Sequence, residues 1–225
     1  MDLYASSLSP LQRLRDLRDV VRANRPPLDV QPIPHLDAAS LALLMEGLES
    51  CTSYLEYGSG GSTLLAAQTG KQVFSVENDL KFARVVRDSL GPDDKVNLTT
   101  IDLGKVRAWA VPVNTRPTPA NVARWSKYPI APWLEVARLG SPLPDFVLVD
   151  GRFRVASAAT SLGQLQGLTH ARVMVDDYIM RPEYWVLEAI GELQGIHGRA
   201  AVFTPKPVDS KKLQSWIGEY QRDWR

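Results

Sequence analysis

Residues Tyr54–Ala67 read YLEYGSGGSTLLAA: an apolar run, a turn with three glycines, and then a segment of helical composition. Glycine has no Cβ, so a turn of this composition lets the backbone approach a neighbouring group closely. Between a strand and a helix, such a turn is typical of a ligand site at a helix N-terminus. The carboxylate of Glu56 stands two residues before the first glycine, and its charge bears on the nature of that ligand.

Strands and helices are predicted to alternate from this turn to the end of the chain. The apolar, β-rich runs are residues 52–58, 71–79, 96–104, 145–151, 171–177 and 199–205. Segments with helical spacing lie between or after them, at residues 62–69, 80–91, 154–168, 182–194 and 209–224. This alternation predicts an α/β fold, a three-layer sandwich with a mostly parallel sheet of six or seven strands between helices.

The composition sets broad limits on function. The chain has 225 residues, 44% of them hydrophobic, and 26 basic against 25 acidic residues give a net charge of +1. We therefore expect no nucleic acid partner and no membrane, since neither the charge nor an apolar span points to them. A single cysteine, Cys51, and the charged amphipathic start of the chain favour a cytoplasmic protein.

The first 51 residues are predicted to form an N-terminal helical segment, and residues 52–225 the main domain. Leucines and valines recur at helical spacing over residues 9–23, and a second helix is expected from Ala38 to about Glu49. The apolar stripe of the first helix suits either a homodimer contact or packing on its own domain. A proline-rich linker over residues 23–34 joins the two helices.

The alternation is interrupted between the third and fourth strands, over residues 104–144. This Pro/Trp-rich insertion holds seven prolines, three tryptophans, and six basic residues against one acid. Its aromatic content argues against disorder. It is expected to be a lid packed on the core, or a substrate cover that favours an anionic or aromatic ligand. As a cover, it would place Trp125 and Trp133 against the substrate.

A carboxylate follows each of the first five predicted strands. The carboxyl ends of parallel strands meet at one edge of a sheet, and ligands of such folds bind there. We therefore expect the acidic side chains to gather at that edge: Glu56, Glu77, Asp102, Asp150, Asp176 and Asp177. Glu77 lies 21 residues after Glu56, a spacing that suits a contact with a ribose hydroxyl.

The glycine turn alone suits several nucleoside ligands, and the negative charge of Glu56 distinguishes between them. A carboxylate beside the turn repels a pyrophosphate and so argues against NAD, whereas it suits a cationic ligand. S-adenosylmethionine has no phosphate and carries an ammonium and a sulfonium group. An NAD-type oxidoreductase is the alternative, because the turn approximates the dinucleotide fingerprint with Thr63 in place of its third glycine.

The pattern E-x-G-x-G-G-S at Glu56–Ser62, with Glu77 ending the next strand, resembles the class I S-adenosylmethionine-dependent methyltransferases, whose fold is Rossmann-like. The resemblance covers roughly residues 52–204. It implies that the turn lines the methionyl part of the cofactor, Glu77 its ribose, and Asn78 or Asp102 its adenine. The other cofactor contacts would be Glu56, Gly58, Ser59, Gly60, Gly61, Ser62 and Asp150.

The run DFVLVDGRFR, with ARVMVDDY after it, resembles a narrower branch, the cation-dependent O-methyltransferases. This implies that Asp150, Asp176 and Asp177 hold Mg²⁺ or another hard divalent cation. Two departures stand against it: Asp177 replaces an Asn of that branch, and Arg152 and Arg154 stand where the branch has a Lys base. Arginine stays protonated, so these two side chains are expected to bind substrate or to neutralise the aspartates. Without a metal, Asp150 or Asp176 is the expected general base.

The sheet of this family closes with an antiparallel pair of strands. Only one good strand follows residue 177, so either the sheet is truncated or a further strand lies near residues 205–208. Taken together, these features predict a methyltransferase that acts on a small-molecule acceptor, at an oxygen. A non-enzymatic binding module that keeps the fold is the second alternative, besides the oxidoreductase.

Overall fold

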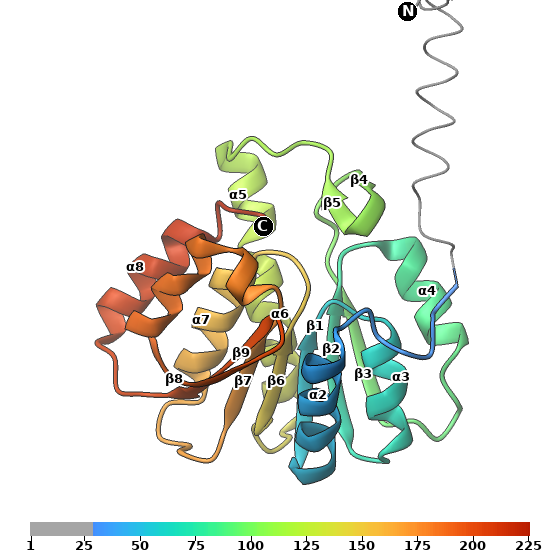
Figure 1. Cartoon of the computed structure of the whole chain (residues 1–225). Coiled ribbons are helices and arrows are strands. Elements are labelled where there is room, and N and C mark those ends of the chain that lie inside the picture. The colour runs from blue at the N-terminus through green and yellow to red at the C-terminus, as the bar shows by residue number, and fades with distance from the viewer. Residues whose placement is uncertain (1–28) are drawn as a thin grey trace, which may run out of the picture.

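The structure is a computed structural model and describes residues 29–225 (Figure 1). The amphipathic helix expected over residues 9–23 lies outside the described residues. The division into residues 1–51 and 52–225 stays a prediction. Within residues 29–225, no helix has the length and apolar character needed to cross a membrane.

The main sheet has seven strands in the order β3-β2-β1-β6-β7-β9-β8, which confirms the predicted α/β class. Its first five members run parallel, whereas β9 pairs antiparallel with both β7 and β8. The strands are β1 (Ser53–Tyr57), β2 (Gln72–Glu77), β3 (Val96–Thr100), β6 (Phe146–Val149), β7 (Arg172–Val175), β8 (Gly191–His197) and β9 (Ala200–Pro205).

Helices cover both faces of the sheet (Figure 1). One face carries α2 (Ala38–Ser50), α3 (Gly61–Gln68) and α4 (Leu80–Asp88); the other carries α6 (Lys127–Leu139), α7 (Arg154–Gln164) and α8 (Ser210–Tyr220). Strand β1 contributes side chains to the cores on both faces of the sheet, because successive side chains along a strand point to opposite faces. Tyr54 packs with α2 and α3, whereas Leu55 and Tyr57 pack in the larger core under α6 and α7.

The helices begin where the sequence supplies a cap. The carboxylates of Asp37, Asp79 and Asp209 accept backbone N–H groups in the first turns of α2, α4 and α8. Such caps satisfy donors that have no partner inside the helix. The start of α2 at Ala38 agrees with the expected second helix.

Residues 104–144 are only partly an insertion. They begin with a small hairpin of β4 (Val106–Arg107) and β5 (Val111–Pro112), joined by the turn η1 (Ala108–Ala110). Helix α5 (Pro119–Trp125) follows, and then α6, which packs on the larger core. Parallel strands need a crossover connection, and α6 supplies it between β3 and β6.

Trp125 and Trp133 lie in the core and not at a substrate surface, so their assignment as substrate contacts is wrong. Trp125 packs against Phe153 with ring centroids 5.7 Å apart. The Trp133 indole donates a hydrogen bond of 2.9 Å to the Tyr57 hydroxyl. Large aromatic side chains contribute strongly to a core when they are buried, and Trp125 and Trp133 are 0% and 4% exposed.

The helix predicted over residues 182–194 is also wrong. The chain there forms the 3₁₀ segment η3 (Pro182–Ala189), which follows a shorter one, η2 (Tyr178–Met180), and then strand β8. Its helix-forming residues are overridden by pairing with β9 over residues 191–197, in a ladder that contains an irregularity at Leu193/Gly195. The sheet is therefore complete, and the missing strand precedes β9 instead of following it.

Candidate active site

The carboxyl ends of the parallel strands bring most of the predicted site residues to one edge. The glycine turn after β1 touches the loop after β6: a Cβ on Gly58 would lie 2.9 Å from the Cα of Gly151. Gly58 has a φ of 90°, in the left-handed region that favours glycine. A Cβ on Gly151 would lie 2.8 Å from the Gly58 nitrogen. Both glycines are needed for this contact, which joins the two halves of the site.

Glu56 does not face this edge, and its assignment as a cofactor contact is wrong. Its side chain is fully buried, on the face of β1 that packs against α3. Hydroxyls surround the carboxylate: Ser62 at 2.7 Å, Ser75 at 2.8 Å, Tyr54 at 3.1 Å, and Thr63. Burial raises the pKa of Glu56, and the hydroxyl hydrogen bonds oppose that rise. Glu56 thus holds the glycine turn and the start of α3 in place from the interior of the protein.

Glu77 ends β2 directly at the turn, as predicted. One carboxylate oxygen accepts the Ser59 backbone N–H at 3.1 Å and its hydroxyl at 3.2 Å. The other accepts the backbone N–H groups of Asn78 at 2.7 Å and Asp79 at 2.8 Å. Burial raises the pKa of Glu77 against the effect of these donors. The contact with Ser59 makes Glu77 part of the turn itself.

Two segments cover the turn. The backbone of residues 31–34 crosses the start of α3, where a Cβ on Gly61 would lie 2.6 Å from the Gln31 carbonyl oxygen. On the other side of the turn, the Asn78 side-chain amide donates a hydrogen bond of 2.7 Å to the Ala110 carbonyl in the small hairpin. The rings of His35 and Trp109 pack against each other at a tilt of 52°, with centroids 5.7 Å apart. The turn is therefore enclosed by the linker and by the β4–β5 hairpin.

Strained backbone gathers at this edge. Among residues 29–225, the non-glycine residues with positive φ are Trp109, Ala110, Phe153 and Asp177. The first two form the hairpin turn above Asn78, and the others follow β6 and β7. Such conformations cost about 1–3 kcal/mol each and cluster at functional sites.

Asp102 follows β3 and lines a cavity. Its carboxylate accepts the Gly104 N–H at 2.8 Å, and the side chain is otherwise exposed. The cavity, of about 520 Å³, lies between the end of β3 and helices α5 and α6. Because Ile101 donates its N–H to the Glu77 carbonyl at 2.9 Å, Asp102 lies next to the end of β2.

Asp150, Asp176 and Asp177 come together as predicted, but around Arg154. This guanidinium is buried and lies 2.8 Å from Asp150 Oδ1 and 3.0 Å from Asp177 Oδ2. It also donates to the Asp176 carbonyl at 2.8 Å and to the Gly151 carbonyl at 3.1 Å. Arg154 therefore ties the loops after β6 and β7 together, and it has no free face for a substrate.

Arg199 is a second cation in this cluster, and the sequence reasoning missed it. Its guanidinium lies 2.8 Å from Asp176 and 3.2 Å from Asp177, and it donates 2.5 Å to the His35 carbonyl. Arg199 sits in the turn between β8 and β9. The antiparallel direction of β9 is what brings that turn to the site edge.

The predicted metal site is therefore wrong for this chain. No group of three His, Cys, Asp or Glu side chains within residues 29–225 is arranged to hold a metal ion. Two guanidinium groups, Arg154 and Arg199, pair with all three of the carboxylates that would bind a hard cation: Asp150 through Oδ1, Asp176 and Asp177. A like charge is excluded from such a position by Coulomb repulsion.

Asp150 and Asp176 differ in their capacity to act as a base. Asp176 is 1% exposed and its carboxylate is held by Arg199, so its assignment as a catalytic residue is wrong. Asp150 keeps 30% of its side chain exposed. Burial, together with Asp176 and Asp177, raises the pKa of Asp150 to about 7, against the opposing charge of Arg154.

No protein-family model matches the chain, and no curated protein is similar to it in sequence. Among solved structures, a methyltransferase-like protein from Silicibacter pomeroyi shares 30% sequence identity with it, at a TM-score of 0.70. The match covers 87% of this chain and 99% of the other. The chain belongs to the class I methyltransferase-like family.

Two more distant structures are also similar to this methyltransferase-like chain. An O-methyltransferase from Bacillus cereus, in complex with SAH, has 16% identity and a TM-score of 0.44, and the match covers 84% of this chain and 74% of the other. An SAH-bound methyltransferase from Podospora anserina has 14% identity and a TM-score of 0.41, with 96% and 86% covered.

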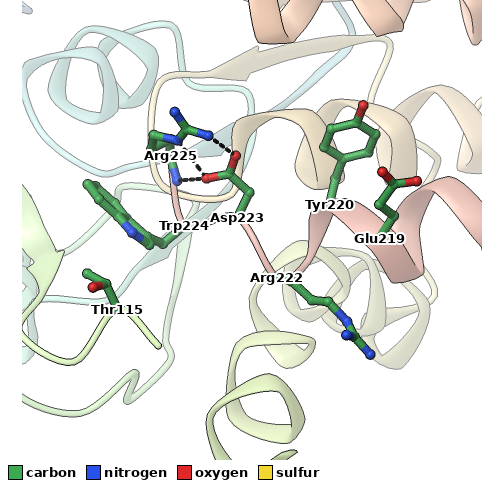
Figure 2. Close-up of a pocket in the computed structure, with 7 residues that line it drawn as sticks. All are labelled: Thr115, Glu219, Tyr220, Arg222, Asp223, Trp224 and Arg225. Carbon is green, nitrogen blue, oxygen red and sulfur yellow. Dashed lines mark hydrogen bonds and ion pairs between the residues drawn. The ribbon is translucent and has the colours of Figure 1, made fainter. Parts of the chain in front are cut away.

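The last residues of this methyltransferase-like chain form one wall of the site. The Phe153 N–H donates to the Trp224 carbonyl at 3.1 Å, and the Arg154 N–H donates to a main-chain carboxylate oxygen of Arg225 at 2.9 Å. Figure 2 shows the adjoining cavity, of about 470 Å³, between this segment and Thr115 of the insertion. The loop after β6 is thereby held between the glycine turn and the C-terminal segment.

Proposed function

We propose that the chain is an S-adenosylmethionine-dependent methyltransferase that acts on an oxygen of a small-molecule acceptor. The observation that carries this proposal is the contact between the glycine turn after β1 and the loop after β6, at the carboxyl edge of the sheet. Glu77 and the glycine turn lie on one side of the Gly58–Gly151 contact, and Asp150 lies on the other. Membership of the methyltransferase-like family supports it.

The residues present fit the cofactor. Glu77 at the end of β2 is placed for the ribose, where a diol would take over the hydrogen bond of the Ser59 hydroxyl. Asp102, beside the cavity of about 520 Å³, is placed for the adenine. The start of α3 favours a carboxylate because its first N–H groups carry partial positive charge. The backbone N–H groups of Gly61 and Ser62 would therefore hold the methionyl carboxylate, since the Ser62 hydroxyl is bound to Glu56.

On the side of the site where the acceptor would bind, Asp150 is placed to act as a base. When bound, S-adenosylmethionine supplies a methyl group on a positively charged sulfur. Asp150, with its pKa raised to about 7, is matched to taking a proton from a hydroxyl near neutral pH. Arg154 fixes this carboxylate through Oδ1, and 30% of the Asp150 side chain stays exposed, so that an acceptor can reach it. The covering linker and hairpin would exclude water from the reacting groups.

Calorimetric titration with S-adenosylhomocysteine tests this proposal. We expect saturable binding by the wild-type protein, and a loss of about tenfold or more in Glu77→Gln, because a charge-assisted hydrogen bond is removed. Glu135→Gln is the matched control, since Glu135 pairs with Arg138 on α6, away from the site edge. Binding of NADH in place of S-adenosylhomocysteine, or of neither, would refute the proposal.

A further inference from the structure

One wall of the cavity at the end of β3 comes from helix α5 and the first residue of α6. This helical wall consists of Ala120, Ala123, Arg124 and Lys127, and the strand side supplies Thr100, Ile101 and Asp102. Because Ser126 between the two helices keeps helical backbone angles, the four residues of the wall recur at the spacing of one helical face. The cavity therefore lies between a single helical face and the carboxyl end of β3.

Two small side chains on this face leave the cavity open. Ala120 and Ala123 are both exposed, so no other part of the described chain fills the space in front of them. The cavity has a volume of about 520 Å³, which lies within the range of ligand pockets, about 300–1,000 Å³. A larger side chain at either position would extend into this space.

Opposite charges line the cavity without neutralising each other. In the described chain the Asp102 carboxylate accepts one hydrogen bond, from the Gly104 N–H at 2.8 Å. Arg124 reaches the same turn from the helix, since a Cβ on Gly104 would lie 2.8 Å from Nη1 of Arg124. Within residues 29–225, the side chains of Arg124 and Lys127 form no ion pair and donate no hydrogen bond. The cavity thus offers a free acceptor and free donors at one turn.

A ligand that suits this cavity presents a hydrogen-bond donor beside an acceptor. A phosphate group has acceptor oxygens only, and the charge of Asp102 would repel it. The edge of adenine carries an amino group beside the ring nitrogen N1, which matches a carboxylate and a guanidinium. Thr100 pairs with Glu77 in the register of β3 and β2, and neighbouring strands lie about 4.8 Å apart. A base attached to a ribose at Glu77 therefore reaches the cavity.

We propose that Arg124, together with Asp102, selects adenine as the base of the cofactor, and that Ala120 and Ala123 make room for the ring. The Asp102 carboxylate accepts a hydrogen bond from the amino group, and the Arg124 guanidinium donates one to N1. This inference rests on the proposed function, because the base belongs to S-adenosylmethionine. Hypoxanthine has a carbonyl in place of the amino group and a hydrogen on N1, so both contacts would oppose it.

Calorimetry on the intact chain, with S-adenosylhomocysteine and S-inosylhomocysteine as separate ligands, tests this selection. We expect wild type to bind the adenine ligand about tenfold or more tightly, because two hydrogen bonds to charged groups are lost with hypoxanthine. Arg124→Gln should weaken binding of the adenine ligand about threefold or more and reduce the preference. Asp102→Asn, whose amide can donate to the hypoxanthine carbonyl, should also reduce it. Arg116→Gln, an exposed arginine of the insertion, is the matched control and should keep both affinities.

A larger side chain on the helical face tests the position of the base. Ala123→Leu places a good helix former at an exposed helical position, so the fold should tolerate it. We expect its affinity for S-adenosylhomocysteine to fall about tenfold or more, because leucine occupies the space of the ring. Ala137→Leu, the same change at an exposed position of α6, should bind like wild type. Thermal unfolding of both variants checks that they are folded.

The outcomes separate this inference from the proposed function. Equal affinity of wild type for the two ligands, or an unchanged preference in Arg124→Gln, would refute the selection by Arg124 and leave the proposed function intact. If Ala123→Leu binds S-adenosylhomocysteine as tightly as Ala137→Leu does, the base lies outside this cavity. If wild type binds neither ligand, the proposed function fails, and the inference fails with it.

Discussion

Glu56 and Glu77 lie at or next to the ends of neighbouring strands, yet their oxygens accept hydrogen bonds from different donors. Glu56 points toward α3 and binds four side-chain hydroxyls in the interior. Glu77 binds the backbone of the turn and of its own strand end, at the site edge. The difference follows from the strand alternation, which directs Glu56 to the same face as Tyr54.

Replacement of Glu56 should therefore reduce stability. Glu56→Ala leaves four buried hydroxyls without their acceptor, and we expect the free energy of unfolding to fall by about 2–4 kcal/mol. Urea unfolding monitored by tryptophan fluorescence measures this change. Glu49→Ala, an exposed position in the last turn of α2, should change it little. Equal stability of the two variants would contradict the role given to Glu56.

At the scale of elements, the β8–β9 hairpin holds the site together from a distance in sequence. Its turn carries Arg199, which bridges Asp176 and Asp177 after β7 to the carbonyl of His35, the residue after the linker. The same turn contacts the start of α2, since the Arg199 N–H donates 3.0 Å to Asp37. The hairpin thus positions both the acidic cluster and the segment that covers Gly61.

Removal of this bridge should weaken the fold and change its response to cations. Arg199→Ala leaves the buried Asp176 carboxylate with a weaker partner, so we expect a loss of about 2–4 kcal/mol in the free energy of unfolding. Thermal unfolding of wild type should be unaffected by millimolar Mg²⁺ or by a chelator, whereas Mg²⁺ should raise the midpoint of the variant. Arg138→Ala is the control. It removes an exposed ion pair with Glu135 on α6 and should leave the unfolding midpoint unchanged. A wild-type midpoint that rises with Mg²⁺ would contradict the arginine-filled cluster.

At the scale of the whole molecule, the titration of the site should appear in the pH dependence of stability. Asp150 has a pKa of about 7 in the folded chain against an ordinary value of 3.8, so folding favours its protonated form. Its contribution to stability is present below the ordinary value and is lost as the pH rises through about 7. Glu56 and Glu77, whose pKa values are also raised by burial, act in the same direction.

Asp150→Asn should flatten this dependence. We expect the free energy of unfolding of wild type to fall more than that of the variant between about pH 5 and pH 8, by about 1–3 kcal/mol. The lower part of this range reflects the 30% of the Asp150 side chain that stays exposed. Urea unfolding at several pH values measures both curves. Parallel curves would show that the pKa of Asp150 is not raised.

The whole molecule also shows which features a sequence can predict. The strand ends could be placed because a parallel sheet brings all of its carboxyl ends to one edge, as Glu77, Asp102 and Asp150 show. Arg199 could not be placed, because β8 has the composition of a helix and its pairing with β9 is set by tertiary contacts. Trp125 and Trp133 were misassigned because the crossover helix that buries them was taken for an insertion.

The orientation of Glu56 was within reach of the sequence. The hydroxyls of Ser62 and Thr63 begin the helix that covers its face of β1, and alternation along the strand places Glu56 beneath them. Its charge was instead taken to face the ligand. The support for S-adenosylmethionine thus moves from Glu56 to Glu77, Asp102 and the glycine turn.

A crystal structure of the chain with S-adenosylhomocysteine tests the proposed cofactor site most directly. We expect density for the ribose at the Glu77 carboxylate and for the adenine beside Asp102, with the sulfur on the side of Asp150. The Arg154 and Arg199 guanidinium groups should remain between Asp150, Asp176 and Asp177, with no metal ion there. Crystals soaked to saturation that show no ligand at this edge, or a ligand elsewhere on the chain, would contradict the proposed site.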